Sequence, residues 1–154
     1  MGKKIFTFIL LIFLSSCGYE AIYSVKKIEN YNFSISKLSF IGDREINLKL
    51  KQKLNNYTRE TKDINFTLKI TSTSEKIILV KNIAGDSTNF KINAIVNIDV
   101  FNKDKLKSNF IITETFSYDN NSNKFELKSH EKEIKKNLAD TIAEKLIFKL
   151  ANIK

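Results

Sequence analysis

FKINAIVNIDV, residues 90–100, alternates between apolar and polar side chains more clearly than any other part of the chain. On an extended backbone, successive side chains point to opposite faces. The alternating residues that share one face are all apolar: Phe90, Ile92, Ala94, Val96, Ile98 and Val100. The pattern predicts a β-strand with one face against a core, so the neighbouring segments must supply more strands and a covering layer.

Two further strands are expected beside it. Residues 64–70 alternate in the same way, and the apolar run at 77–80 is a candidate extension of that strand. Gly85 and Asp86 mark a turn at 82–87, and another turn is expected at 102–105. A strand over 108–118 follows, with Phe110, Ile112, Phe116 and Tyr118 on one face and Glu114 interrupting them. Short turns of this kind join antiparallel strands.

The outer segments complete the fold. Residues 32–40 predict a first strand with one irregularity near Lys37, and Asp43 is a candidate N-cap for an amphipathic helix from Arg44 to about Tyr57. Residues 125–153 predict one long helix, with apolar residues at helical spacing. The fold class is therefore α+β: a two-layer sandwich with a four-stranded mixed sheet (β-α-β-β-β-α) and two helices on one face.

The N-terminus has the layout of a lipoprotein signal. Two lysines precede an apolar run at 5–14, which is too short to span a bilayer. Leu14-Ser15-Ser16-Cys17 resembles a lipobox, so we expect residues 1–16 to be cleaved and Cys17 to carry the lipid anchor. Residues 17–31 would be a lipidated tether and 32–154 a single domain. The alternatives are an ordinary signal peptide and an uncleaved anchor. Cys17 is the only cysteine, so an intramolecular disulfide is impossible.

Charge gives a weaker indication. Without Lys3 and Lys4 the chain keeps 24 basic and 17 acidic side chains, a formal balance of +7. Two explanations stay open: attraction to anionic lipid headgroups or phosphorylated glycans, and a compositional bias towards lysine. Nucleic acid is not an expected partner, because the predicted signal exports the protein away from it.

No residue pattern predicts catalysis, so we expect a protein that is not an enzyme and that has neither cofactor nor metal. His130, the only histidine, is expected to be a solvated helix residue, and Glu131 and Glu133 would point in different directions. For Glu114 we favour a position at the sheet margin that reaches water over a buried partner for a lysine. Lys81 and Lys91 flank the turn at 82–87 and are candidate contacts for phosphate or lipopolysaccharide.

Cys-Gly-Tyr at 17–19 and Ile-Tyr-Ser at 22–24, together with the predicted element order, resemble the alphaproteobacterial lipopolysaccharide-assembly lipoproteins, the LptE family. The resemblance implies an outer-membrane subunit on a lipid anchor that assembles with and plugs an LptD-like β-barrel translocon and contacts lipopolysaccharide. The arginines typical of relatives near the hairpin at 82–87 are missing here. The alternative is a lipid-anchored periplasmic binding module or an auxiliary subunit of a lipid transporter.

Overall fold

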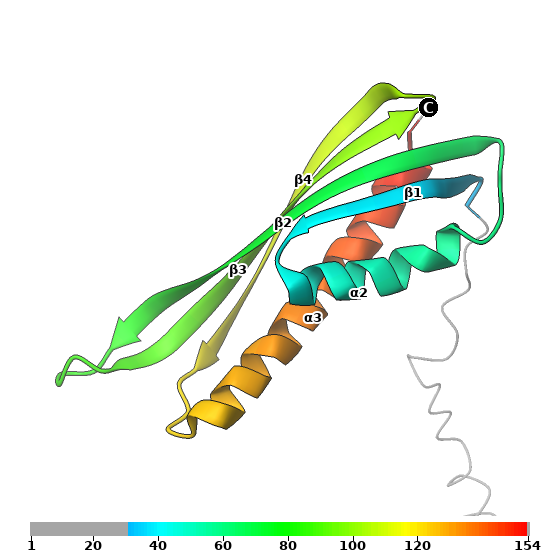
Figure 1. Cartoon of the computed structure of the whole chain (residues 1–154). Helices are drawn as coiled ribbons and strands as arrows, with labels where there is room; N and C mark the ends of the chain where they lie inside the picture. Colours follow the sequence, from blue (N-terminus) through cyan, green and yellow to red (C-terminus); the bar gives the residue numbers. More distant parts are fainter. Residues whose placement is uncertain (1–30, 154) are drawn as a thin grey trace, which may run out of the picture. The chain divides into compact units, whose positions relative to one another are not determined.

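The computed structural model describes residues 31–153 of the chain. The predicted signal peptide, Cys17 and all of the tether except Tyr31 lie outside the described residues. The elements are β1 (Phe33–Gly42), α2 (Arg44–Leu54), the 3₁₀ turn η1 (Asn55–Tyr57), β2 (Ile64–Lys81), β3 (Ser87–Asn102), β4 (Lys105–Asp119) and α3 (Lys124–Ala151) (Figure 1).

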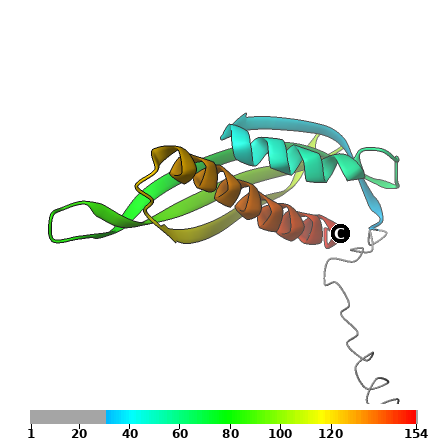
Figure 2. The same ribbon diagram turned by 90° about the horizontal axis from the view of Figure 1, so that it is seen from below.

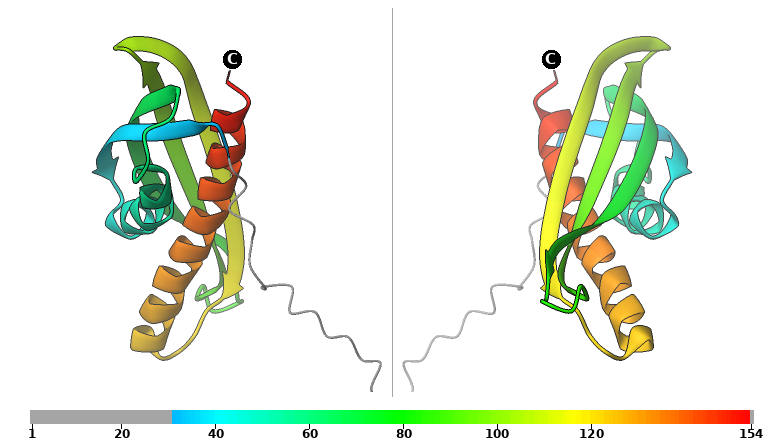
Figure 3. Two further views of the ribbon diagram at one scale, coloured as in Figure 1. Left: turned by 90° about the vertical axis from the view of Figure 1, so that its right-hand side faces the viewer. Right: turned by 90° about the vertical axis from the view of Figure 1, so that its left-hand side faces the viewer.

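The four strands form one mixed sheet in the order β1-β2-β3-β4. β1 runs parallel to β2, and the other two neighbouring pairs are antiparallel. The register of β1 shifts between Ile35 and Lys37, which confirms the irregularity expected there. Both helices lie on the same face of the sheet (Figures 2 and 3). The predicted fold class is therefore confirmed.

The core fills the space between the sheet and the helices. The alternating residues predicted from 90 to 100 all face it, and each is buried. The helices contribute their apolar stripes, which are buried as well: Ile46, Leu50 and Leu54 from α2, and Ile134, Leu138, Ile142, Leu146 and Leu150 from α3. Asp140 of α3 pairs with Lys49 and Lys53 of α2, at 3.1 Å in both cases. The two helices are thus joined by charge as well as by apolar packing.

Asp43 joins several elements at the corner between β1 and α2. Its Oδ1 accepts the backbone N–H groups of Glu45 and Ile46 at 3.0 and 3.1 Å, which confirms the predicted N-cap. Its Oδ2 accepts hydrogen bonds from Ser74 Oγ of β2 at 2.6 Å and from Lys135 Nζ of α3 at 2.8 Å. One carboxylate therefore connects α2 with both the sheet and the other helix.

The pKa of Asp43 lies below its ordinary value of 3.8. Partial burial acts to raise it, but the hydrogen bonds from Lys135, Ser74 and the Ile46 amide outweigh that effect. The pKa of Glu131 also lies below its ordinary value of 4.5: burial acts to raise it, and hydrogen bonds from Lys76 and Tyr118 outweigh burial. Both groups therefore stabilise the folded state in their charged forms.

These two shifts predict a loss of stability in acid. A carboxyl whose pKa is lowered by folding stabilises fully above its unfolded pKa, and that contribution disappears as the pH falls through the folded pKa. We expect the midpoint of thermal unfolding to be nearly constant from pH 7 to about pH 5 and to fall below about pH 4. In Asp43→Asn the fall between pH 7 and pH 3 should be smaller, and an equal fall would contradict the role assigned to this carboxylate.

The structure differs from the sequence-based expectation at the end of α2. The helix ends at Leu54, and Tyr57 lies in η1, where its ring stacks on Phe33 with the centroids 5.3 Å apart. Packing against a distant segment therefore decides where this helix ends. The candidate extension of the second strand is confirmed, because β2 continues without a break to Lys81 and includes the apolar run at 77–80.

Candidate functional site

Within residues 31–153, no helix covers the face of the sheet opposite α2 and α3 (Figure 3). Alternation places the residues between the core positions on this face, and the strand register aligns them in rows across β2, β3 and β4. Most are uncharged and polar: Thr71, Thr73, Asn93, Asn97, Asn109, Thr113, Thr115 and Ser117. Ile95 and Ile111 lie among them, and Ile111 is 66% exposed. We call this set of ten residues the open face.

Asn109 of the open face binds two neighbouring side chains, Asn97 of the same set and Asp99 beside it. Asn109 Nδ2 donates to Asn97 Oδ1 and to Asp99 Oδ1, at 2.7 Å in both cases. The four threonine hydroxyls, at 71, 73, 113 and 115, form no side-chain hydrogen bond within the part of the chain that is described. The open face therefore presents hydroxyls that can both donate to a partner and accept from it.

Lys81 and Lys91 both lie on the β2–β3 hairpin, as expected, but on different rungs. Lys81 is opposite Ser87, and Lys91 is opposite Ile77. Lys81 lies four steps along β2 from Ile77, which corresponds to roughly 13 Å. The two lysines are therefore separate cations rather than the two sides of one phosphate-sized site.

The residues around His130 form a structural cluster. Glu131 Oε1 accepts hydrogen bonds from Lys76 Nζ at 2.6 Å and from Tyr118 Oη at 2.7 Å, while His130 itself is exposed and touches Tyr118 only by its ring edge. Burial and the bond to Glu131 raise the pKa of Tyr118. Glu133 pairs instead with Lys136, which confirms that the two glutamates point in different directions. The cluster fastens the start of α3 to β2 and β4.

Glu114 lies at the sheet margin, as expected, because β4 is an edge strand. The expectation that its carboxylate simply reaches water is corrected by its surroundings. Its side chain is only 18% exposed, and its carboxylate accepts a hydrogen bond from Lys145 of α3. The lysine partner belongs to the same domain. The carboxylate therefore joins α3 to the sheet edge instead of simply reaching water.

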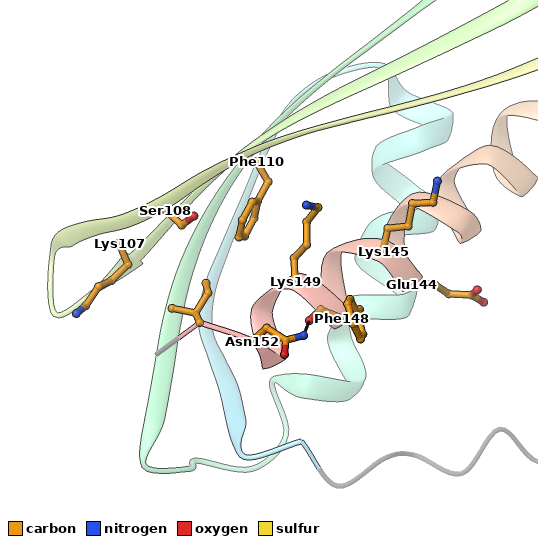
Figure 4. A pocket seen from close by; sticks show the side chains of 9 residues that line it. Lys107, Ser108, Phe110, Glu144, Lys145, Phe148, Lys149 and Asn152 are labelled. Atoms are coloured by element: carbon orange, nitrogen blue, oxygen red, sulfur yellow. Dashed lines mark hydrogen bonds between the residues drawn. The ribbon is translucent and has the colours of Figure 1, made fainter.

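A groove that the sequence did not indicate lies between β4 and the end of α3 (Figure 4). Its volume is about 890 Å³. Phe110 and Phe148 line it, and Lys149 Nζ lies 5.1 Å from the centre of the Phe110 ring. Lys107 is also in the lining. Phe148 is 66% exposed and lies outside the buried stripe of α3. Its position off that stripe is the one signal in the sequence that could have indicated the groove.

Two other properties of the described residues bear on function. Among residues 31–153, no group of histidine, cysteine, aspartate or glutamate side chains is arranged to hold a metal ion. No helix in that range combines the length and the apolar character needed to cross a membrane.

The fold defines the class: a two-layer α+β domain with one open sheet face. Solved structures that share it include rare lipoprotein B from Shewanella oneidensis, with a TM-score of 0.55, 16% identity, and coverage of 75% of this chain and 97% of that one. The minor lipoprotein from Acinetobacter baumannii has a TM-score of 0.56 and 15% identity, with coverage of 79% and 91%. At such identities the likeness establishes the fold alone. No family model matches the chain, and no curated protein matches it.

Proposed function

We propose that the protein is an outer-membrane lipoprotein, anchored through Cys17, that assembles with and plugs the β-barrel translocon for lipopolysaccharide and so assists insertion at the cell surface. Three features support the proposal. They are the lipobox-like sequence before Cys17, the resemblance of residues 17–24 to the lipopolysaccharide-assembly lipoproteins, and a fold shared with bacterial lipoproteins of low identity.

The open face is the observation that carries the proposal. A protein that fills the lumen of a membrane β-barrel meets a polar wall, because the apolar side chains of such barrels face the lipid. Threonine and asparagine suit this wall, since they exchange hydrogen bonds with side chains of either charge and cost little to desolvate when paired. The open face runs over three strands and supplies such groups in rows.

The first experiment is a mild-detergent pull-down of the C-terminally tagged protein from its native membranes, with mass spectrometry of the proteins that accompany it. We expect an outer-membrane β-barrel in stoichiometric amount. Reproducible absence of a barrel, with transporter subunits recovered instead, would overturn the proposal.

A pair of substitutions tests whether the open face makes the contact. Thr73 and Thr113 lie on either side of Ile95 in one row. The double variant Thr73→Glu/Thr113→Glu should recover about tenfold less barrel, because it places two unpaired charges in the interface. The matched control is Ser129→Glu/Thr141→Glu on exposed positions of α3, which should recover the normal amount. Equal recovery by both double variants would show that another surface binds the barrel.

The groove between β4 and α3 favours a second candidate function, a lipid-anchored binding module. Its aromatic lining and the nearby lysines Lys107 and Lys149 are the kind of surface that takes an apolar ligand with an anionic group. In that case the purified protein should be monodisperse without a barrel and should carry a lipid detectable by native mass spectrometry. Phe148→Asp should then abolish lipid retention and leave the fold intact.

A further inference from the structure

The tip of the β2–β3 hairpin is apolar on both faces. The hairpin extends past the covering helices (Figures 1 and 2). Along the rest of β2 only one face is apolar, but at 77–80 the alternation stops, and Ile78, Leu79 and Val80 are each about half exposed. Ile83 in the turn is fully exposed. Apolar side chains that gather on a projecting tip indicate a surface that is covered by something else.

The start of α3 contributes an exposed apolar side chain at the same end of the domain as the hairpin tip. The last residues of β4 pair with Asn89, close to the hairpin turn, and Asn120 N donates to the Thr88 carbonyl at 2.8 Å. α3 begins directly after this loop, and its Phe125 is 82% exposed. Figure 3 shows the hairpin turn and the start of α3 at one end of the domain. We call Ile78, Leu79, Val80, Ile83 and Phe125 the apolar end.

Part of the backbone of the hairpin turn is hydrogen-bonded within the turn. Asn82 N donates to the Asp86 carbonyl at 2.8 Å, and Gly85 N donates to the Asn82 carbonyl at 3.0 Å. Asp86 N donates to Asn82 Oδ1 at 2.9 Å. These bonds satisfy three N–H groups of the turn, whereas those of Ile83 and Ala84 form no hydrogen bond within residues 31–153. The turn therefore suits the headgroup boundary of a bilayer, where water still reaches the backbone, and not the acyl interior.

The acidic and basic groups around the apolar end differ in whether they already have partners. Its carboxylates accept hydrogen bonds from asparagines: Asp86 from Asn82, Asp119 from Asn89, and Glu126 from Asn121 and Asn123. Its lysines, by contrast, form no ion pair with any residue in the described range: Lys81, Lys91, Lys124 and Lys128. Uncommitted lysines around apolar side chains match an anionic lipid surface, where phosphates lie above acyl chains.

We propose that the apolar end is a membrane-docking site, which inserts Ile83 and its neighbours into the headgroup and acyl boundary of an anionic phospholipid bilayer. This contact is additional to the barrel and to the lipid on Cys17. The apolar end lies at the end of β2. The chain enters β1 beside the start of β2, because Phe33, the first residue of β1, pairs with Ile64, the first residue of β2. The 18 residues of β2 correspond to roughly 56 Å along the strand.

The absence of tryptophan from the chain allows a direct test. The chain of residues 17–154 with Cys17→Ser keeps the whole core and carries no lipid, and Ile83→Trp gives it one fluorophore at the tip. On vesicles of phosphatidylcholine with about 30 mol% phosphatidylglycerol, we expect emission at shorter wavelength and quenching by brominated acyl chains. The matched control is Ile111→Trp on the open face, which should show neither change. If the emission wavelength of the Ile83→Trp variant stays the same when vesicles are added, the proposal is overturned.

Vesicle sedimentation measures the contribution of the tip. Leu79→Asn/Ile83→Asn should lower partitioning into the anionic vesicles by about tenfold, and Leu106→Asn/Ile111→Asn, also at exposed apolar positions, should leave it unchanged. Equal partitioning of all variants would contradict the proposal, as would equal binding to vesicles of phosphatidylcholine alone. Because these vesicles contain neither a barrel nor lipopolysaccharide, failure here leaves the plug proposal standing, and failure of the pull-down leaves this one standing.

Discussion

Replacing Gly42 by alanine is expected to lower the free energy of unfolding by about 3 kcal/mol or more. Gly42 ends β1 with φ +105°, a backbone conformation that residues with a side chain rarely adopt. A Cβ atom there would lie 1.8 Å from the Ser72 carbonyl oxygen of β2, which cannot move without disturbing the strand pair. The variant must therefore distort the corner at which Asp43 caps α2.

Gly85 provides the matched control for this substitution. It also has a positive φ, +89°, but no atom lies within 4 Å of the position that a Cβ would take. Gly85→Ala should therefore show only the conformational cost, about 1 kcal/mol. Urea unfolding of both variants measures the difference. Similar losses of stability in the two would show that the close approach to Ser72 does not constrain the corner.

Replacing Cys17 by serine is expected to abolish lipid attachment completely. In the proposed attachment the thiol of Cys17 would take up the diacylglycerol, and a hydroxyl at that position is a much weaker nucleophile at neutral pH. Stable anchoring needs two or more acyl chains, so the variant should lose its resistance to extraction from membranes. Incorporation of labelled palmitate and the mass of the mature N-terminus measure the change.

Ser16→Ala is the control for the Cys17 variant, because it keeps a small side chain beside the expected cleavage site. Its labelling should equal that of the unmodified protein. Labelled palmitate on the Cys17→Ser chain would locate the lipid elsewhere and remove the basis for the anchor. We expect the Cys17→Ser chain to keep some attachment to membranes through the apolar end. High salt should reverse this attachment, because the contact depends on headgroup charge.

Much of the fold could be predicted because each element carries its own local signal. In β3, apolar and polar residues alternate along the strand, and α3 has one uninterrupted stripe of apolar residues. Asp43 lies directly before the first residue of α2, which is the N-cap position. Parallel pairing of β1 with β2 followed from the helix between them. In each case the decisive residues are neighbours in sequence.

The site could be predicted only in part, because its members meet across elements. Phe110 and Phe148 line one groove from β4 and α3, and no spacing along the chain connects them. Lys145 likewise reaches Glu114 from the other layer. The polar rows of the open face were implied by alternation, but the strand register that aligns Thr73, Ile95 and Thr113 became visible only in the sheet.

The strand order has a consequence for how the chain folds. The sheet is arranged in the order of the sequence, and β2, β3 and β4 are joined by the short segments 82–86 and 103–104. Closing these short loops costs little chain entropy, whereas joining β1 to β2 requires residues 43–63 to be ordered first. The antiparallel meander is therefore expected to form early, and β1 with α2 to complete the domain late.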